Sequence, residues 1–286
     1  MVRSAFPKHG LTGILLIVIF WYINWFGEGL RTHWAFFPLW LGYILTIDGI
    51  AVWRGQRSWI TNDYRKFATQ FLISIPFWWF FEWLNERAGY WVYLPEGAFS
   101  PIAHTFWSTL CFSTVVPAVF VTANMLLSFR WFAQHHVRWR SGYTSRGRWI
   151  YFLTGIALLI ALLIWPQYGM AFMWVSLFFI ISPLNFSLGK MSLMRYTAER
   201  DWRMVFVLFA AALICGVFWE MWNIQSWPKW IYTFPYVDGW KIFEMPAAGY
   251  LGYLPFGLEI WAIVALLYPA IARDLNDALD ARTKPI

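Results

Sequence analysis

Two pairs of residues place a carboxylate and an amide at the end of an apolar segment. Glu82 is followed by Asn85, and the same spacing returns 138 positions later as Glu220 and Asn223. Residues three apart share a face of a helix, and a carboxylate in a membrane-type segment is costly enough to indicate a function. Two such carboxylates facing one cavity would serve as a general acid. In the structural alternative, each glutamate is ionised at a helix end and bonded to water or loop donors.

An aromatic motif follows each pair. Trp91-Val92-Tyr93 follows the first and Trp230-Ile231-Tyr232 the second, and a proline comes soon after each motif. Trp and Tyr combine a large apolar ring with a hydrogen-bonding group, which suits contact with an apolar substrate. We therefore expect six residues to bind the substrate, namely Trp91, Tyr93, Trp230, Tyr232, Glu244 and Tyr253.

Glu259 is the third candidate acid, and it has no acidic counterpart 138 positions earlier. It lies near the middle of the last apolar segment, just after Pro255 and Gly257, where a functional role is the default interpretation. The alternative is a protonated side chain bonded to a neighbouring helix. Asp48, near the end of the second apolar segment, is expected to be a structural ion pair or a carboxylate that reaches the interface.

Motifs for metal or cofactor chemistry are missing from the sequence. It contains no HxxxH, HExxH, phosphate-binding loop, GxSxG or DxxxD cluster. This argues against di-iron desaturation, ATP-driven pumping, serine hydrolysis and prenyl transfer, because each depends on such residues. We expect no cofactor and no metal. The two cysteines, Cys111 and Cys215, are too few for a disulfide framework.

The composition shows that these residues are set in a membrane protein. Of the 286 residues, 60% are hydrophobic, 22% aromatic and 13% charged, and apolar runs of about 18 or more residues indicate transmembrane helices. The many Trp and Tyr residues fit belts at the two membrane interfaces. We attribute the net charge of +7 to topology and not to nucleic-acid binding. The predicted fold class is an all-α polytopic membrane protein.

Eight transmembrane helices are predicted, with both termini in the cytoplasm of a cell with a bacterial-type inner membrane. The segments are 11–26, 34–53, 67–85, 106–128, 149–166, 168–188, 203–223 and 249–272. This topology puts all but four of the 22 Lys and Arg residues on the cytoplasmic side, as the positive-inside rule requires. The aromatic loops 86–105 and 224–248 then lie outside, at the headgroup level or over the mouth of the helix bundle.

The 138-residue offset divides the eight helices into two tandem repeats of four. The first repeat and the start of a basic linker occupy residues 1–138, and the second repeat and a cytoplasmic tail occupy residues 139–286. An even number of helices per repeat makes the repeats parallel, with a pseudo-two-fold axis along the membrane normal. The basic linker, residues 129–148, is expected to fix the topology and to contact anionic lipid.

The order of these motifs resembles that of small multi-helix membrane carotenoid enzymes, the lycopene-cyclase-domain type and its hydratase relatives. In that family a Pro-Trp-Asp-Asn-like helix end is followed by Gly-x-Trp-x-Tyr and then by a Pro-Leu-Glu-Glu-Tyr-like helix start. Here Glu82 stands at the Asp position, and Gly89, Trp91 and Tyr93 follow at similar spacing. The resemblance implies a helical bundle and acid-catalysed chemistry on an isoprenoid.

The adjacent acids of that family are replaced in both halves of this chain. Ala103-His104 stands at their place in the first half and Ala247-Ala248 in the second. An acid for this chemistry would therefore have to come from another position. Four glutamates remain for that role, namely Glu82, Glu220, Glu244 and Glu259.

The sequence thus predicts a membrane protein that acts on an apolar isoprenoid-like or lipid substrate by acid-assisted chemistry. Glu82, Glu220 and Glu259 are the candidate acids, and Asn85 and Asn223 would orient the acid or a water. Acid-catalysed addition or cyclisation needs no cofactor. The expected partner is a membrane lipid or isoprenoid, with no nucleic acid, and a homo-oligomer is left open.

Two other functions are left open by the sequence. In a proton-coupled transporter, Glu259 and Asp48 would relay protons along the bundle. In a non-catalytic membrane scaffold, the outer aromatic loops would dock a partner.

Overall fold

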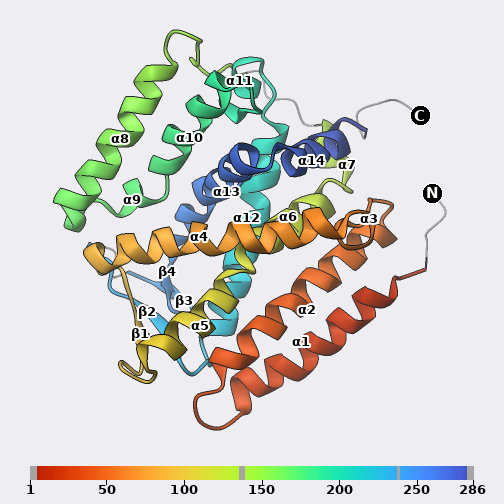
Figure 1. Ribbon diagram of the computed structural model, residues 1–286, viewed down its shortest axis with the longest axis vertical. Helices are drawn as coiled ribbons and strands as arrows, with labels where there is room; N and C mark the ends of the chain where they lie inside the picture. The colour runs from red at the N-terminus through yellow and green to blue at the C-terminus, as the bar shows by residue number, and fades with distance from the viewer. Residues whose placement is uncertain (1–4, 135–138, 237–238, 282–286) are drawn as a thin grey trace. The chain divides into compact units, whose positions relative to one another are not determined.

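The computed structural model describes residues 5–134, 139–236 and 239–281 (Figure 1). Within these ranges, six helical stretches are long and apolar enough to cross a membrane. They are Lys8–Phe26, Thr32–Trp53, Pro101–Leu126, Met170–Ser187, Arg203–Asn223 and Ala247–Leu267. The prediction of an all-α, multi-pass membrane protein is therefore confirmed.

The two remaining predicted spans also fall in helices. Segment 67–85 lies in α4, Tyr64–Ala88, which has 25 residues but a less apolar composition than the six stretches above. Segment 149–166 lies mostly in α8, Arg148–Ile164, which is apolar but has only 17 residues. Since a helix rises about 1.5 Å per residue, α8 is near the lower limit for crossing a bilayer. The total of eight spans stays a prediction.

Three predicted spans are interrupted. Segment 106–128 divides into α5, Pro101–Phe112, and α6, Val115–Leu126. Between them the Thr114 hydroxyl bonds back to the Cys111 carbonyl, a contact that competes with helical bonding. Segment 168–188 contains α9, Met170–Met173, and α10, Ser176–Ser187, and begins at the end of the 3-10 helix Pro166–Tyr168. Segment 249–272 contains most of the 3-10 helix Ala247–Gly252, all of α13, Tyr253–Leu267, and the start of α14, Pro269–Ala281.

The first compact unit comprises Met1–Met125 and Ile214–Tyr250. Its helices are α1 (Lys8–Phe26), α2 (Thr32–Trp53), α3 (Trp59–Asn62), α4, α5, most of α6 and the end of α12 (Arg203–Asn223). Helices α1 and α2 run side by side (Figure 1). A Cβ atom at Gly13 would lie 2.6 Å from the Thr46 backbone nitrogen, so glycine permits the close approach of these helices.

Two short antiparallel strand pairs also belong to the first unit. β1, Trp91–Leu94, pairs with β2, Lys229–Tyr232, and β3, Lys241–Ile242, pairs with β4, Met245–Pro246. The sequence predicted only aromatic loops in these regions. The ladder β1–β2 joins the two Trp-x-Tyr motifs, which are far apart in the chain.

The second compact unit comprises Leu126–Leu213 and Leu251–Ile286. It holds α7 (Arg130–Gln134), α8, α9, α10, α11 (Leu193–Ala198), the start of α12, α13 and α14. Helix α10 packs against both α8 and α13 (Figure 1). Each unit combines residues from both halves of the sequence. The predicted repeat boundary after residue 138 is not tested by this grouping, and residues 135–138 lie outside the described ranges.

Candidate functional site

Glu82 lies near the end of α4, and three neutral groups donate hydrogen bonds to its carboxyl. Its Oε1 accepts the Tyr93 hydroxyl at 2.6 Å, the Trp78 indole at 3.0 Å and the Trp91 indole at 3.3 Å. Trp78 lies one turn before Glu82 on the same helical face. Trp91 and Tyr93 alternate along β1 and so share one face of the strand. These bonds orient the carboxyl without pairing it with a cation.

Glu220 lies near the end of α12 and repeats the main contact. Its Oε1 accepts the Tyr232 hydroxyl at 2.6 Å, and the Tyr232 oxygen accepts the Trp230 indole at 3.0 Å. The Glu220 side chain is fully buried, and Glu82 is 9% exposed. Each half of the sequence therefore supplies a buried glutamate bonded to the tyrosine of its own Trp-x-Tyr motif.

Asn85 and Asn223 connect the helix ends to the strands. The Asn85 amide donates to the Trp91 carbonyl at 2.8 Å, and its oxygen accepts the Trp91 backbone N–H at 3.1 Å. The Asn223 amide donates to the Trp230 carbonyl at 2.7 Å, and its oxygen accepts the Trp230 N–H at 3.0 Å. Each asparagine thus satisfies backbone groups of a strand. The expected role, in which the amides orient the acid or a water, stays a prediction.

The tyrosine in the first site is held in its protonated form. Burial, and then the neighbouring Glu82 carboxyl, raise the pKa of Tyr93 well above its usual value. The phenol therefore remains a hydrogen-bond donor to Glu82 across the physiological pH range. This geometry can fix a carboxyl oxygen in place and keep the rest of the group available for proton transfer.

The end of α4 leads directly into the first strand. Gly89 follows the helix with φ +65°, a left-handed conformation that glycine adopts without strain. Its N–H bonds the Asn85 carbonyl at 2.7 Å. Thr233 then extends the ladder, since its N–H bonds the Tyr90 carbonyl at 2.9 Å. The turn at Gly89 thus brings β1 back to the carboxyl of Glu82, which Trp91 and Tyr93 contact.

Further residues of the first unit support the second strand, and sequence reasoning missed them. Asn24 on α1 is fully buried and donates to the Trp222 carbonyl at 2.9 Å, and its oxygen accepts the Thr32 hydroxyl at 2.9 Å. The Thr32 oxygen in turn accepts the Trp227 backbone N–H at 2.6 Å. An asparagine inside the first apolar run was the available signal, because a polar group there needs a partner. Trp78 was also missed, although it stands one helical turn before Glu82.

Glu259 belongs to the second unit and binds the start of a neighbouring helix. Its Oε1 accepts the Leu177 backbone N–H at 3.1 Å, in the first turn of α10. The first N–H groups of a helix lack intrahelical partners, and a carboxylate is favourable at that end. Glu259 is fully buried, and this bond joins α13 to the neighbouring helix α10.

The remaining predicted site residues are placed as follows. Glu244 forms an ion pair with Lys229 at the start of β2. Tyr253, at the start of α13 in the second unit, contacts the Phe256 ring with centroids 6.5 Å apart. Asp48 is fully buried and accepts the Ser58 hydroxyl at 2.6 Å and the Trp59 backbone N–H at 2.8 Å.

Comparisons with protein-family models, curated proteins and solved structures gave no match for this chain. Among the described residues, no group of three or more His, Cys, Asp or Glu side chains is arranged to hold a metal ion. The site's own geometry is therefore the basis for its chemistry. In the first unit, that geometry combines Glu82 with Tyr93 and Glu220 with Tyr232.

Proposed function

We propose that this multi-pass membrane protein acts on an apolar isoprenoid-like or lipid substrate by acid-assisted chemistry at Glu82 and Glu220. The observation that carries the proposal is the repeated hydrogen bond from a motif tyrosine to a buried glutamate, 2.6 Å in both halves. A single buried Glu–Tyr bond is common as a structural contact. Its repetition beside the same aromatic motif favours a functional site, and the resemblance to carotenoid enzymes points to an isoprenoid.

The proposed reaction is a proton transfer to a carbon–carbon double bond. The three bonds to Oε1 of Glu82 orient the carboxyl, and the proposal assigns the transferred proton to Oε2. Protonation breaks the double bond's π pair to form a C–H bond and leaves a carbocation and a carboxylate. The carboxylate then recovers a proton from an adjacent carbon after cyclisation, or from a water that adds to the cation. The glutamic acid is regenerated at the end of the reaction, so no cofactor is needed.

The aromatic residues fit this chemistry. Indole and phenol rings present electron-rich faces to a cation. Trp91 and Tyr93 contact the Glu82 carboxyl, and Tyr232, which accepts the Trp230 indole, contacts that of Glu220. We further propose eight spans with both termini in the cytoplasm of a bacterial-type inner membrane. This places both Glu–Tyr pairs toward the outer interface, where an apolar substrate would enter from the lipid. The support is the distribution of Lys and Arg.

The test is conversion of an acyclic carotenoid, supplied in proteoliposomes of the full-length protein. Products are separated by chromatography and their molecular masses are measured by mass spectrometry, since hydration adds the mass of one water and cyclisation gives an isomer. Glu82→Gln and Glu220→Gln keep an acceptor oxygen but cannot supply the proton, so each should lower turnover by about 100-fold or more. Glu86→Gln is the matched control, because Glu86 is an exposed acid one turn further along α4.

Two outcomes would remove the proposal. One is full turnover in both Glu82→Gln and Glu220→Gln. The other is no conversion by the wild type, together with the absence of isoprenoid among the lipids that copurify in mild detergent. Loss of turnover in Glu86→Gln as well would show that the effect is one of charge and not of proton transfer.

A proton-coupled transporter is the second candidate, and Glu259 favours it. Its carboxyl is fully buried, and its Oε2 has no hydrogen-bond partner among the described residues. A buried acid in a membrane helix is typical of proton relays. Flux of a substrate into proteoliposomes that depends on a pH gradient, and that Glu259→Gln abolishes, would support transport. Equal flux without the gradient would exclude it.

A further inference from the structure

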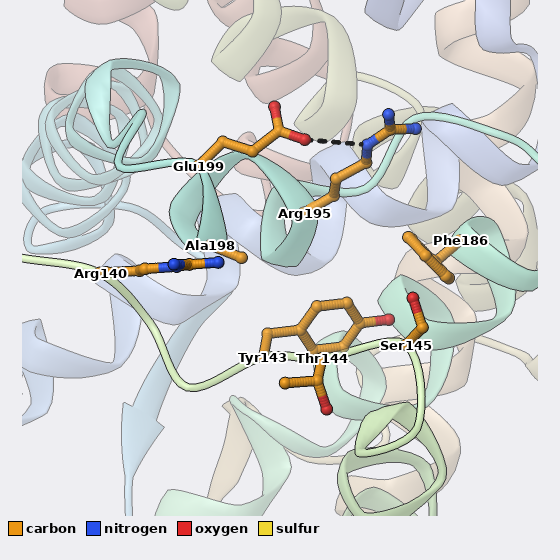
Figure 2. Close-up of a pocket in the computed structure, with 8 residues that line it drawn as sticks. All are labelled: Arg140, Tyr143, Thr144, Ser145, Phe186, Arg195, Ala198 and Glu199. Atoms are coloured by element: carbon orange, nitrogen blue, oxygen red, sulfur yellow. Dashed lines mark hydrogen bonds and ion pairs between the residues drawn. The ribbon is translucent and has the colours of Figure 1, made fainter.

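The second unit contains a cavity of about 470 Å³ at the ends of its helices. None of its lining residues is used by the proposed function. Figure 2 shows its lining residues: Arg140, Tyr143, Thr144, Ser145, Phe186, Arg195, Ala198 and Glu199. The wall thus combines two guanidinium groups, three hydroxyls and two aromatic rings with a single carboxylate.

The linker segment that forms one wall is fixed against the segment from α11 to Trp202. The Ser141 N–H bonds the Thr197 carbonyl at 3.1 Å, and the Thr197 hydroxyl bonds the Ser141 hydroxyl at 3.0 Å. The Trp139 and Trp202 rings stack with centroids 4.7 Å apart. These contacts hold the segment on both sides of Arg140, whose side chain extends toward Ala198 (Figure 2). The wall is therefore an ordered part of the fold.

Tyr143 supplies the observation that points to a ligand. The side chain is 6% exposed, and its hydroxyl has no hydrogen-bond partner within residues 5–134, 139–236 and 239–281. A buried hydroxyl without a partner is costly and calls for an explanation. Burial raises the pKa of Tyr143, so the phenol is a donor at neutral pH. A ligand oxygen in the cavity would accept this hydrogen bond.

The charges of the lining select an anion. Arg140 is exposed and extends into the cavity (Figure 2). Arg195 contacts Glu199 at 3.2 Å, but both side chains are more than 60% exposed, at 63% and 61%. An exposed pair of this kind is weak, so an anion with several oxygens can replace the carboxylate on Arg195. Guanidinium groups with nearby hydroxyls match phosphate oxygens in geometry and charge.

The place of the cavity in the fold restricts the ligand further. Helix α8 begins at Arg148, three residues after Ser145, and α10 ends one residue after Phe186. The cavity therefore lies where two apolar helices end, at the level of a membrane surface. We propose that it binds the phosphate group of an anionic molecule, either a lipid headgroup or a water-soluble phosphate. Arg140, Arg195 and the Tyr143 hydroxyl hold the phosphate.

The experiment measures dissociation constants by calorimetry on the full-length protein in a neutral detergent. The probes are dioctanoyl phosphatidic acid, dioctanoyl phosphatidylcholine and inorganic phosphate. Arg140→Gln and Arg195→Gln should each weaken phosphatidic acid binding by about tenfold, since a charged hydrogen bond is lost. Tyr143→Phe should weaken it by a smaller factor. Glu199→Gln should tighten binding, because Arg195 loses its competitor.

Arg130→Gln is the control, since Arg130 is an exposed arginine in the same unit outside the cavity. Inorganic phosphate that binds with the same dependence on the arginines identifies a free phosphate, and binding of phosphatidic acid alone identifies a lipid headgroup. The proposal is overturned if no probe binds at millimolar concentration, or if phosphatidylcholine binds as tightly as phosphatidic acid. It is also overturned if Arg130→Gln weakens binding as much as the cavity variants do.

Discussion

Val92 and Ile231 pair at the centre of the β1–β2 ladder, and the two Trp-x-Tyr motifs are symmetric about that pair. Trp91 faces Tyr232 on one side, and Tyr93 faces Trp230 on the other. An antiparallel pair has a local two-fold axis at its centre. The motif of each sequence half therefore occupies an equivalent place, and each motif tyrosine reaches the glutamate of its own half.

The asparagine contacts predict a loss of stability when either amide is removed. Asn85→Ala leaves the backbone N–H and carbonyl of Trp91 without their side-chain partner, and Asn223→Ala does the same at Trp230. Each variant should lower the free energy of unfolding by about 1–3 kcal/mol. Thermal unfolding in detergent, followed by tryptophan fluorescence, measures the change.

Asn62→Ala provides the control for these variants, because Asn62 is exposed at the end of α3. It should leave the unfolding temperature nearly unchanged. If Asn85→Ala and Asn223→Ala were as stable as the wild type yet inactive, the amides would act on the substrate or a water instead. That result would support the role expected from the sequence.

The helices could be predicted from the sequence, because a long apolar run has few other structures available in a membrane. Each of the eight predicted spans lies largely in helix. The interruptions could not be predicted in the same way. The break before α6 depends on Ser113 and Thr114 bonding back to carbonyls of α5, and this choice is made by local packing. The break after α13 was visible, because Pro269 disfavours helix at Tyr268.

The site could be predicted only in part. The repeat identified Glu82 and Glu220, but the ladder joins segments about 138 residues apart, and pairing at such a distance leaves no local pattern. The alternation of Trp and Tyr around Val92 and Ile231 was the available sign of a strand. The i, i+3 spacing made Asn85 look like a partner of Glu82. In the structure it extends past the helix end to the strand backbone.

Glu259 is predicted to stabilise α10 through its Oε1. Glu259→Gln keeps a carbonyl oxygen for the Leu177 N–H and should change the free energy of unfolding by less than about 1 kcal/mol. Glu259→Leu removes the acceptor and should cost about 1–3 kcal/mol, because a buried backbone donor then lacks a partner. Thermal unfolding of both variants checks this. Equal loss in the two variants would show that the charge itself, and not the acceptor, is needed.

His9 and Asp48 are predicted to act as a coupled pair at the ends of α1 and α2. His9 Nε2 lies 3.0 Å from Asp48 Oδ2, close enough for an ion pair. Asp48→Asn exchanges an acceptor for a donor opposite the Ser58 hydroxyl or the Trp59 N–H. It should cost about 1–3 kcal/mol of stability.

A double-mutant cycle with His9→Gln separates the pair from the other bonds of Asp48. Residues in direct contact show coupling energies of about 0.5–3 kcal/mol, so the double variant should lose less than the two single variants together. Unfolding temperatures of the four proteins give the cycle. Strict additivity would show that Asp48 is held by Ser58 and Trp59 alone.

The two helices that fall outside the apolar set, α4 and α8, give the sharpest test of the topology. If α4 crosses the membrane, residues 62 and 96 lie on opposite sides, and if α8 crosses it, residues 145 and 167 do. Single cysteines are introduced by Asn62→Cys, Glu96→Cys, Ser145→Cys and Gln167→Cys, each at an exposed position. The background carries Cys111→Ala and Cys215→Ala.

A membrane-impermeant maleimide, applied to spheroplasts, should label positions 96 and 167 at once and positions 62 and 145 only after permeabilisation. This pattern follows from cytoplasmic termini and eight spans, because an odd number of crossings then precedes positions 96 and 167. Immediate labelling of both 62 and 96, or of neither, would mean that α4 lies along the membrane surface. The same result at 145 and 167 would mean this for α8, and labelling of neither 62 nor 96 would move Glu82 from the outer interface to the cytoplasmic side.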